Sequence, residues 1–280
     1  MRDLLLANIT YCKLSTRFED LLAERPILSR NNRDELDHGF ASWLLDQAAG
    51  SSAASIRDTS GIAFAKNVMR WRGFISRIYI HRPIMMWYAM RKANLSRLPH
   101  DKQNAIITCR GLANELIRDI QTTWHVPTPC QMAGWCATWQ LYQATMVPLL
   151  SLFCDLDDPT THQESMAHIE IALSALKDLE KWSPTAKRSL EVVSRLFEAG
   201  RAFIAKNAPQ LPSNTLDSAS VPLDTPSTAD SATMYEGFFV QDFFDEVSWN
   251  NGQDSAFASG ELELSFLDYW DIGQEANSMA

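Results

Sequence analysis

The histidines and cysteines are the side chains that could hold a metal ion or act in catalysis. His162 and His168 lie six residues apart, and Gln163 follows the first of them. A zinc-protease helix instead needs two histidines four residues apart on one face, with a glutamate as the general base. Cys130 and Cys136 are also six residues apart and lack a second pair of ligands. We therefore expect surface histidines on a helix and buried, reduced thiols rather than a metal site.

Other catalytic patterns are also missing from the sequence. The segment Asp58-Thr59-Ser60-Gly61 is similar to an aspartic-protease triplet, but a residue interrupts it, it occurs once, and a helix follows. An N-cap with a first helical turn is the simpler interpretation. The chain has no glycine-rich phosphate loop and no nucleophile elbow. We expect a protein without enzymatic activity.

A basic stretch between Asp58 and Asp101 could bind nucleic acid. Basic side chains interleaved with aromatic rings, without acids, are typical of such surfaces. The alternative is that its apolar stripe belongs to the core and that some arginines pair with acids of neighbouring helices. We favour this alternative because Arg70, Arg77 and Arg82 do not share one helical face. The basic residues are Lys66, Arg70, Arg72, Arg77, Arg82, Arg91, Lys92 and Arg97.

The strongest chemical signal lies in the acidic tail, residues 207–280. Lys206 is the last basic residue, and the 13 carboxylates that follow it give the tail a charge of about -13. Residues 1–206 hold the other 21 acidic and all 25 basic side chains, a net charge of +4. Residues 207–233 are rich in Pro, Ser, Thr, Ala and Asp, which predicts a disordered linker.

Residues 234–280 contain two clusters of aromatic and acidic side chains, near 238–249 and 262–271. Apolar residues recur at every fourth position in each cluster and would share one face of a helix. Such a segment can fold into an apolar groove of a partner, with its acids facing a basic rim. The alternative is that one cluster packs back on the body as a final helix. The candidate partner-binding residues are Phe239, Phe243, Phe244, Val247, Trp249, Leu262, Phe266, Leu267, Tyr269 and Trp270.

Residues 1–206 are predicted to form an all-α body that precedes this tail. Apolar side chains recur at steps of three and four, and no segment alternates in the manner of a strand. We therefore expect no sheet. This pattern predicts helices over 3–23, 34–48, 64–78 and 106–120, with a polar linker at 49–55.

Three further helix starts are expected from one chemistry. A side-chain oxygen at the N-cap accepts a hydrogen bond from an unpaired amide, and a proline follows at the first helical position, where its missing N–H costs nothing. The pairs Thr128-Pro129, Asp158-Pro159 and Ser183-Pro184 predict helices near 129–153, 159–181 and 184–206.

Residues 120–154 lack Asp, Glu, Lys and Arg and could be mistaken for a membrane span. A span needs about 20 predominantly apolar residues, whereas glutamines, threonines and three prolines interrupt this stretch. We expect a central helix buried by its neighbours. The odd number of cysteines and the lack of a secretory signal predict an intracellular protein with reduced thiols.

One segment resembles a known family. Residues 69–83 read MRWRGFISRIYIHRP, which is similar to the regulatory domain, or middle homology region, of fungal zinc binuclear cluster transcription factors. Their helix reads tryptophan-arginine, then an arginine among aliphatics, then a closing tyrosine- or histidine-arginine-proline. Segments 109–113, 135–150 and 176–186 resemble the same family in the same order, so the likeness covers roughly residues 1–200.

The resemblance implies an all-helical regulatory domain, nuclear localisation and a role in regulating transcription by RNA polymerase II. The acidic, aromatic end of the chain suggests an activator. The resemblance also implies coactivators or general transcription machinery as partners, and a small-molecule inducer as a further candidate. The family binds DNA through an N-terminal cluster in which six cysteines hold two zinc ions. This sequence has no such array, so we assign no zinc, no other cofactor and no DNA ligand to the chain.

We therefore expect contact with DNA only through a missing domain or a partner. The chain resembles the C-terminal part of such a factor, either as a truncated gene product or as a remnant. The alternative from another class is a stand-alone helical module that binds a protein or a small ligand and does not bind DNA.

Overall fold

The computed structural model describes residues 2–25, 27–51, 60–91, 94–126, 128–154 and 158–207. Within these residues the chain forms α-helices, one short 3-10 helix and no strand, which confirms the predicted all-α class. The elements are α1 (Arg2–Glu24), α2 (Arg30–Ser51), α3 (Ser60–Met90), η1 (Leu95–Arg97), α4 (His100–Thr123), α5 (Gln131–Ser151), α6 (Pro159–Leu179) and α7 (Pro184–Asn207).

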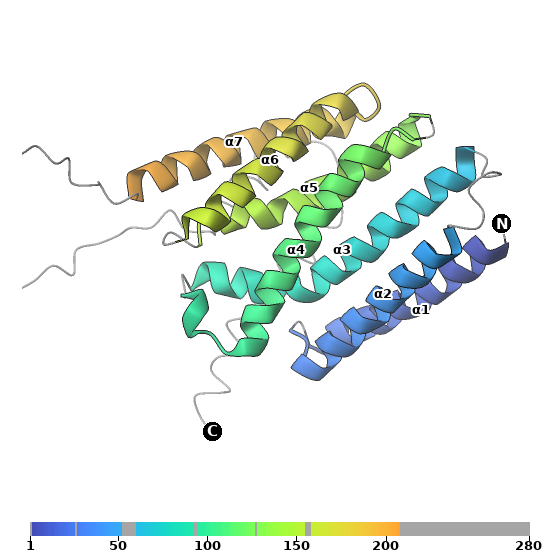
Figure 1. Ribbon diagram of the computed structural model, residues 1–280, viewed down its shortest axis with the longest axis horizontal. Helices are drawn as coiled ribbons and strands as arrows, with labels where there is room; N and C mark the ends of the chain where they lie inside the picture. Colours follow the sequence, from blue (N-terminus) through green and yellow to red (C-terminus); the bar gives the residue numbers. More distant parts are fainter. Residues whose placement is uncertain are drawn as a thin grey trace, which may run out of the picture.

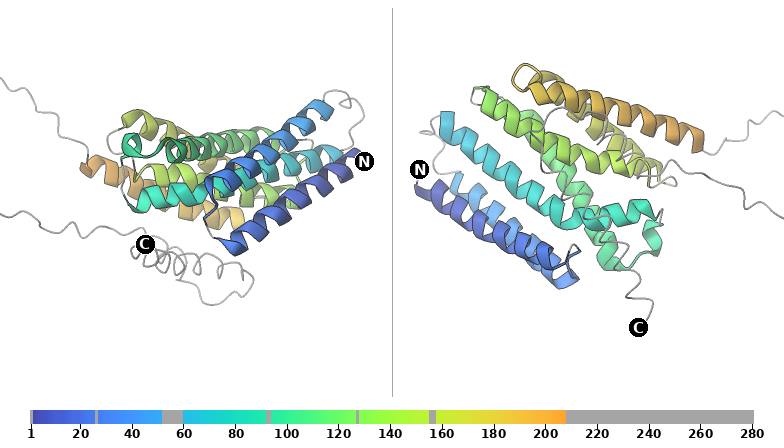
Figure 2. Two further views of the ribbon diagram at one scale, coloured as in Figure 1. Left: turned by 90° about the horizontal axis from the view of Figure 1, so that it is seen from below. Right: turned by 180° about the vertical axis from the view of Figure 1, so that it is seen from behind.

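The helix α3 is the centre of this arrangement. It contacts α1 and α2 on one side and α4 and α5 on the other. The helices α6 and α7 lie beyond α5, and α4 crosses α3 and α5 obliquely (Figures 1 and 2). The body is therefore a helical array in which α3 joins a small helical pair, α1 with α2, to a larger group, α4 to α7.

The core consists of two hydrophobic clusters that meet at α3. The larger cluster extends from α3 to α7 and includes Trp71 and Ile78, both fully buried. The smaller cluster packs Tyr11 of α1 against Phe40 of α2 and takes Ile80 from α3. Because α3 supplies apolar side chains to both clusters, it is apolar on more than one side, as a helix buried between neighbours requires.

The uncharged stretch forms α5, which is largely buried. Ala137, Leu141 and Ala144 are fully buried on its inner side, whereas Met132 and Trp135 near its start are exposed. None of the described helices combines the length and the apolar character that crossing a membrane requires.

Two of the three predicted helix starts are confirmed. The Oδ1 atom of Asp158 accepts hydrogen bonds from the amides of Thr160 (3.0 Å) and Thr161 (3.2 Å), and α6 begins at Pro159. Hydrogen bonds from Thr161 hold the pKa of Asp158 below its usual value. The helix α7 begins at Pro184, as predicted.

The third predicted start, at Thr128-Pro129, is wrong by two residues. The helix α5 begins at Gln131, and the Cys130 sulfur accepts a hydrogen bond from the amide of Ala133 at 3.4 Å. Cysteine is an uncommon N-cap, and this is why the sequence pattern favoured the threonine.

Several predicted helices are shorter than the observed ones. The helix α2 begins at Arg30 rather than residue 34 and continues to Ser51, into the predicted linker. The helix α3 extends beyond the predicted 64–78 and continues through Pro83 to Met90. Tertiary packing of α3 on both of its sides outweighs the local cost of a proline inside a helix. Of the predicted N-cap segment, Asp58 and Thr59 lie outside the described residues.

Two glycines give a matched test of this packing. An alanine Cβ at Gly134 in α5 would lie 2.5 Å from the Cβ of Trp182 and 3.1 Å from its carbonyl carbon, whereas one at Gly111 in α4 would meet no atom within 4 Å. We expect Gly134→Ala to lower the free energy of unfolding by about 1–3 kcal/mol through overpacking. Gly111→Ala should raise it by about 0.5–1 kcal/mol, because glycine is a poor helix former.

The measurement is urea unfolding of both variants followed by circular dichroism. Equal stabilities for Gly134→Ala and Gly111→Ala would contradict the close contact of α5 with the segment around Trp182.

Candidate functional site

The basic residues of α3 are bound by side chains from its neighbours. Asp119 of α4 accepts two hydrogen bonds from Arg70, at 3.0 Å from Nε and 2.8 Å from Nη2. The same carboxylate accepts a hydrogen bond from the indole N–H of Trp71 at 2.8 Å. This arrangement neutralises Arg70 and satisfies the one polar atom of a fully buried tryptophan.

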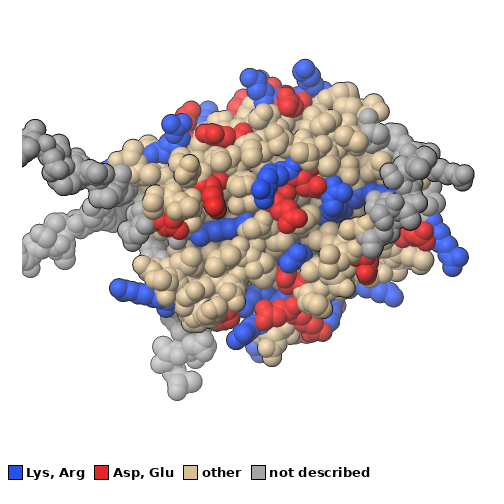
Figure 3. All heavy atoms as spheres, viewed as in Figure 1, with Lys and Arg blue, Asp and Glu red and all other residues tan. Residues whose placement is uncertain are grey.

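The other arginines of α3 point to different helices. Arg77 donates two hydrogen bonds to Asp37 of α2, at 2.7 Å and 3.0 Å, and Arg82 donates one to Gln143 of α5 at 3.0 Å. The guanidinium carbon of Arg72 lies 4.3 Å from the ring centre of Tyr11 in α1. The prediction that arginines in this stretch pair with neighbouring helices is confirmed for Arg70 and Arg77. On the face in Figure 3, basic and acidic side chains are interspersed, and no broad basic surface forms.

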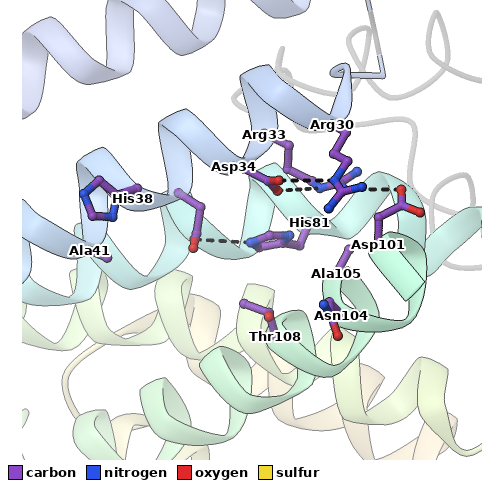
Figure 4. A pocket seen from close by; sticks show the side chains of 11 residues that line it. Arg30, Arg33, Asp34, His38, Ala41, His81, Asp101, Asn104, Ala105 and Thr108 are labelled. Carbon is purple, nitrogen blue, oxygen red and sulfur yellow. Dashed lines mark ion pairs between the residues drawn. The ribbon is translucent and has the colours of Figure 1, made fainter. Parts of the chain in front are cut away.

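A cavity of about 270 Å³ opens between α2, α3 and α4. Its inner wall holds Arg33 of α2 and His81 of α3, and Asp101, Asn104 and Thr108 of α4 form the opposite wall (Figure 4). Polar side chains from three helices therefore converge on one space.

His81 lies at the bottom of this cavity with 5% of its surface exposed. Its Nε2 atom lies 3.2 Å from Oδ1 of Asp37, and this contact lowers the pKa of that carboxyl. The other ring nitrogen, Nδ1, has no partner among the described residues. A buried polar atom without a partner is costly.

Asp37 is the anionic group beneath the cavity. Burial would raise the pKa of this carboxyl, but the nearby His81 and the bidentate Arg77 outweigh burial and lower it to about 2. Asp37 is therefore ionised at neutral pH, and Arg77 compensates its charge.

Arg33 is the second buried polar group of the cavity, with a side chain only 5% exposed. Its Nε lies 3.8 Å from Asp34, and its Nη2 lies 3.7 Å from Asp101. Both distances exceed those of hydrogen bonds, and Nε has no hydrogen-bond partner among the described residues. The charge of Arg33 is balanced from a distance while at least one of its donors is unused.

The cavity can therefore bind a polar molecule. Its deep part offers the donors of Arg33 and His81, and its mouth offers the carboxylates of Asp34 and Asp101. Within the described ranges, no group of three or more His, Cys, Asp or Glu side chains could hold a metal ion.

All ten predicted partner-binding residues, Phe239, Phe243, Phe244, Val247, Trp249, Leu262, Phe266, Leu267, Tyr269 and Trp270, lie outside the described part of the chain.

The expectations for histidines and cysteines hold only in part. His168 is partly exposed on α6. His162 is only 5% exposed and faces the interior side of α6, so its prediction as a surface residue is wrong. All five cysteines are free thiols. Cys109 is buried, and burial raises the pKa of its thiol to about 12. The expectation of buried thiols is wrong for Cys12 and Cys130, which are exposed.

The sequence patterns did not predict this cavity, although the spacing of its polar residues indicates a contact between two helices. Arg33 and Asp37 are spaced by four residues in α2, and Arg77 and His81 are spaced by four in α3. Polar residues at this spacing share a helical face. Two such faces, with Asp37 opposite both Arg77 and His81, are consistent with a polar contact between two helices.

Comparisons with known proteins supply no relative: no family model, no curated protein and no solved structure matches this chain. The functional argument therefore depends on the residues and their geometry.

The lowered pKa of Asp37 predicts a pH-dependent contribution to stability. A carboxyl whose pKa falls from 3.8 to about 2 on folding contributes about 2 kcal/mol above pH 4, and this contribution is lost as the pH falls towards 2. Asp37→Asn should therefore lose at least about 2 kcal/mol of unfolding free energy at pH 7. The difference from wild type should shrink between pH 4 and pH 2.

The measurement is urea unfolding at several pH values, with Asp46→Asn on the exposed surface of the same helix as the control. A pH-independent difference between wild type and Asp37→Asn would contradict the stabilising role of the ionised carboxylate.

Proposed function

We propose that this chain is a transcription regulator of the fungal zinc-cluster type, which acts in the nucleus through protein contacts on transcription by RNA polymerase II. The helical body is its regulatory part. Residues 234–280 form the segment that recruits coactivators or general transcription machinery. DNA is reached through another domain or through a partner.

One observation carries this proposal: the segment that resembles the family, residues 69–83, lies in the helix around which the body is built. Its Trp71 is fully buried, and its Arg70 and Arg77 are bound to carboxylates of α4 and α2. The residues that carry the resemblance are thus the ones on which this fold depends. This agreement between motif and architecture supports the assignment to a regulatory domain.

The charge distribution supports the role of the tail. The arginines of α3 that could have attracted an acidic segment are engaged within the body. The 13 carboxylates of residues 207–280 have no basic residues among them. An acidic, aromatic segment of this composition fits a basic-rimmed apolar groove on a partner protein.

A second function, binding of a small ligand by the body without DNA, is favoured by a different observation. The cavity between α2, α3 and α4 contains buried polar groups that have unused hydrogen-bonding capacity. In the first proposal, such a ligand would be the signal to which the regulator responds.

The recruiting role can be tested with residues 207–280 fused to an unrelated DNA-binding domain in a reporter assay. We expect activation, and we expect replacement of Phe243, Phe244, Phe266 and Trp270 by alanine to reduce it by about tenfold or more, because apolar anchors dominate such interfaces. Alanine at Thr215, Ser218, Ser220 and Thr225 in the linker is the matched control and should leave activation unchanged.

An inactive fusion, or one that the four aromatic replacements leave fully active, would contradict the recruiting role. If a cluster instead packs on the body as a final helix, removal of residues 234–280 lowers the melting temperature of the remainder, which differential scanning calorimetry measures.

A further inference from the structure

We propose that the cavity between α2, α3 and α4 binds a small zwitterion, a free amino acid. Its carboxylate is held by Arg33 and His81, and its ammonium group faces Asp34 and Asp101. This inference rests on the second proposed function, ligand binding by the body, and it does not depend on the tail.

The need for a ligand comes from the two buried side chains at the bottom of the cavity. Arg33 and His81 are each about 95% buried, and both point into the space shown in Figure 4. The Nε of Arg33 and the Nδ1 of His81 have no partner among the described residues, whereas the Nε2 of His81 faces Asp37 at 3.2 Å. Buried polar atoms in folded proteins are nearly always paired, so Nε of Arg33 and Nδ1 of His81 are available to a polar molecule in the cavity.

A carboxylate is the group that suits these nitrogens best. A guanidinium and a ring N–H are donors, and a planar carboxylate can accept from both the fork of an arginine and a neighbouring donor. The side chains of Thr108 and Asn104 lie on the opposite wall and can donate as well. The two ion pairs of Arg33, at 3.7 Å and 3.8 Å, are too long for hydrogen bonds, so its Nε donor remains available to such a ligand.

The charges around the mouth favour a ligand without net charge. Asp34 is exposed and Asp101 is partly exposed, and both lie at 3.7–3.8 Å from Arg33, beyond hydrogen-bond distance. Arg30 and Arg33 balance these two acids, and Arg77 balances Asp37, so the wall is close to neutral. A zwitterion keeps this balance, with its ammonium group towards the two acids, whereas sulfate or phosphate would add uncompensated negative charge.

The size of the cavity agrees with an amino acid. A volume of about 270 Å³ is far larger than the roughly 10–15 Å³ that a single water requires. The cavity therefore has room for a small organic molecule such as an amino acid. Ala41 and Ala105 also line the cavity and provide the small apolar surface that an amino-acid side chain can cover.

Isothermal titration calorimetry of the full chain with each of the 20 standard amino acids tests the proposal. We expect at least one to bind. The amide of the tightest-binding amino acid lacks the carboxylate, and its N-acetyl derivative lacks the charged amine. Each derivative should bind about tenfold or more weakly, because each loses a charge-assisted contact. Absence of binding by all 20 amino acids would overturn the proposal, as would equal binding by sodium sulfate.

Variants connect the binding to this cavity. Arg33→Met should raise the Kd of the tightest-binding amino acid by about tenfold or more. Arg188→Met on the exposed surface of α7 should leave this Kd unchanged. Asp101→Asn changes a residue at the mouth and provides the second variant if Arg33→Met does not fold. Asp101→Asn should raise the Kd of the amino acid but not that of its N-acetyl derivative.

Equal Kd values for wild type, Arg33→Met and Asp101→Asn would overturn the placement in this cavity. The outcome is separate from that of the reporter assay, because calorimetry reads the body and the reporter reads the tail. If the tail fusion activates the reporter but the chain binds no amino acid, the ligand proposal is wrong and the recruiting role still holds.

Discussion

The pairing of α3 with carboxylates from both of its sides is the interaction on which the rest of the structure depends. Arg77 is held by Asp37 of α2, and Arg70 together with Trp71 is held by Asp119 of α4. Arg77, whose side chain is 18% exposed, could not lie between these helices without this compensation, because an unpaired buried charge costs several kcal/mol. The two acids thus permit α3 to join the two hydrophobic clusters, and they fix its rotation between its neighbours.

The cavity is a consequence of the same arrangement. Asp37 is bound to Arg77 on one side, and His81, one turn further along α3, meets the same carboxylate only through Nε2, which leaves Nδ1 without a partner among the described residues. Arg33, one turn before Asp37 on α2, is buried beside the same space. The Arg77–Asp37 pair and the Arg33–Asp101 pair therefore lie beside one polar hollow. In the proposed function, a signal ligand would bind in this hollow.

Much of the fold was predictable from the sequence, and most of the site was not. The apolar spacing that runs through Trp71 and Ile78 predicted α3, and Asp158 marked the start of α6, because both depend on local chemistry. The length of α3 beyond Pro83 and the extension of α2 to Ser51 depend on packing between helices, which spacing along one segment does not encode. The sequence predicted that arginines of α3 pair with acids of neighbouring helices. It could not identify Asp37 as the partner of Arg77, because several helices carry acids. The cavity requires three helices to be placed together, and the burial of His162 requires knowledge of which face of α6 is covered.

A double-mutant cycle on Asp37 and Arg77 tests the central claim most directly. Unfolding free energies of Asp37→Asn, Arg77→Met and the double variant would be compared with wild type at pH 7. If the pair holds α2 against α3, each single variant is strongly destabilised, and the double variant loses about 1–3 kcal/mol less than the two single losses together. Losses that add to within about 0.5 kcal/mol would contradict the claim, because the two residues would then stabilise the fold independently.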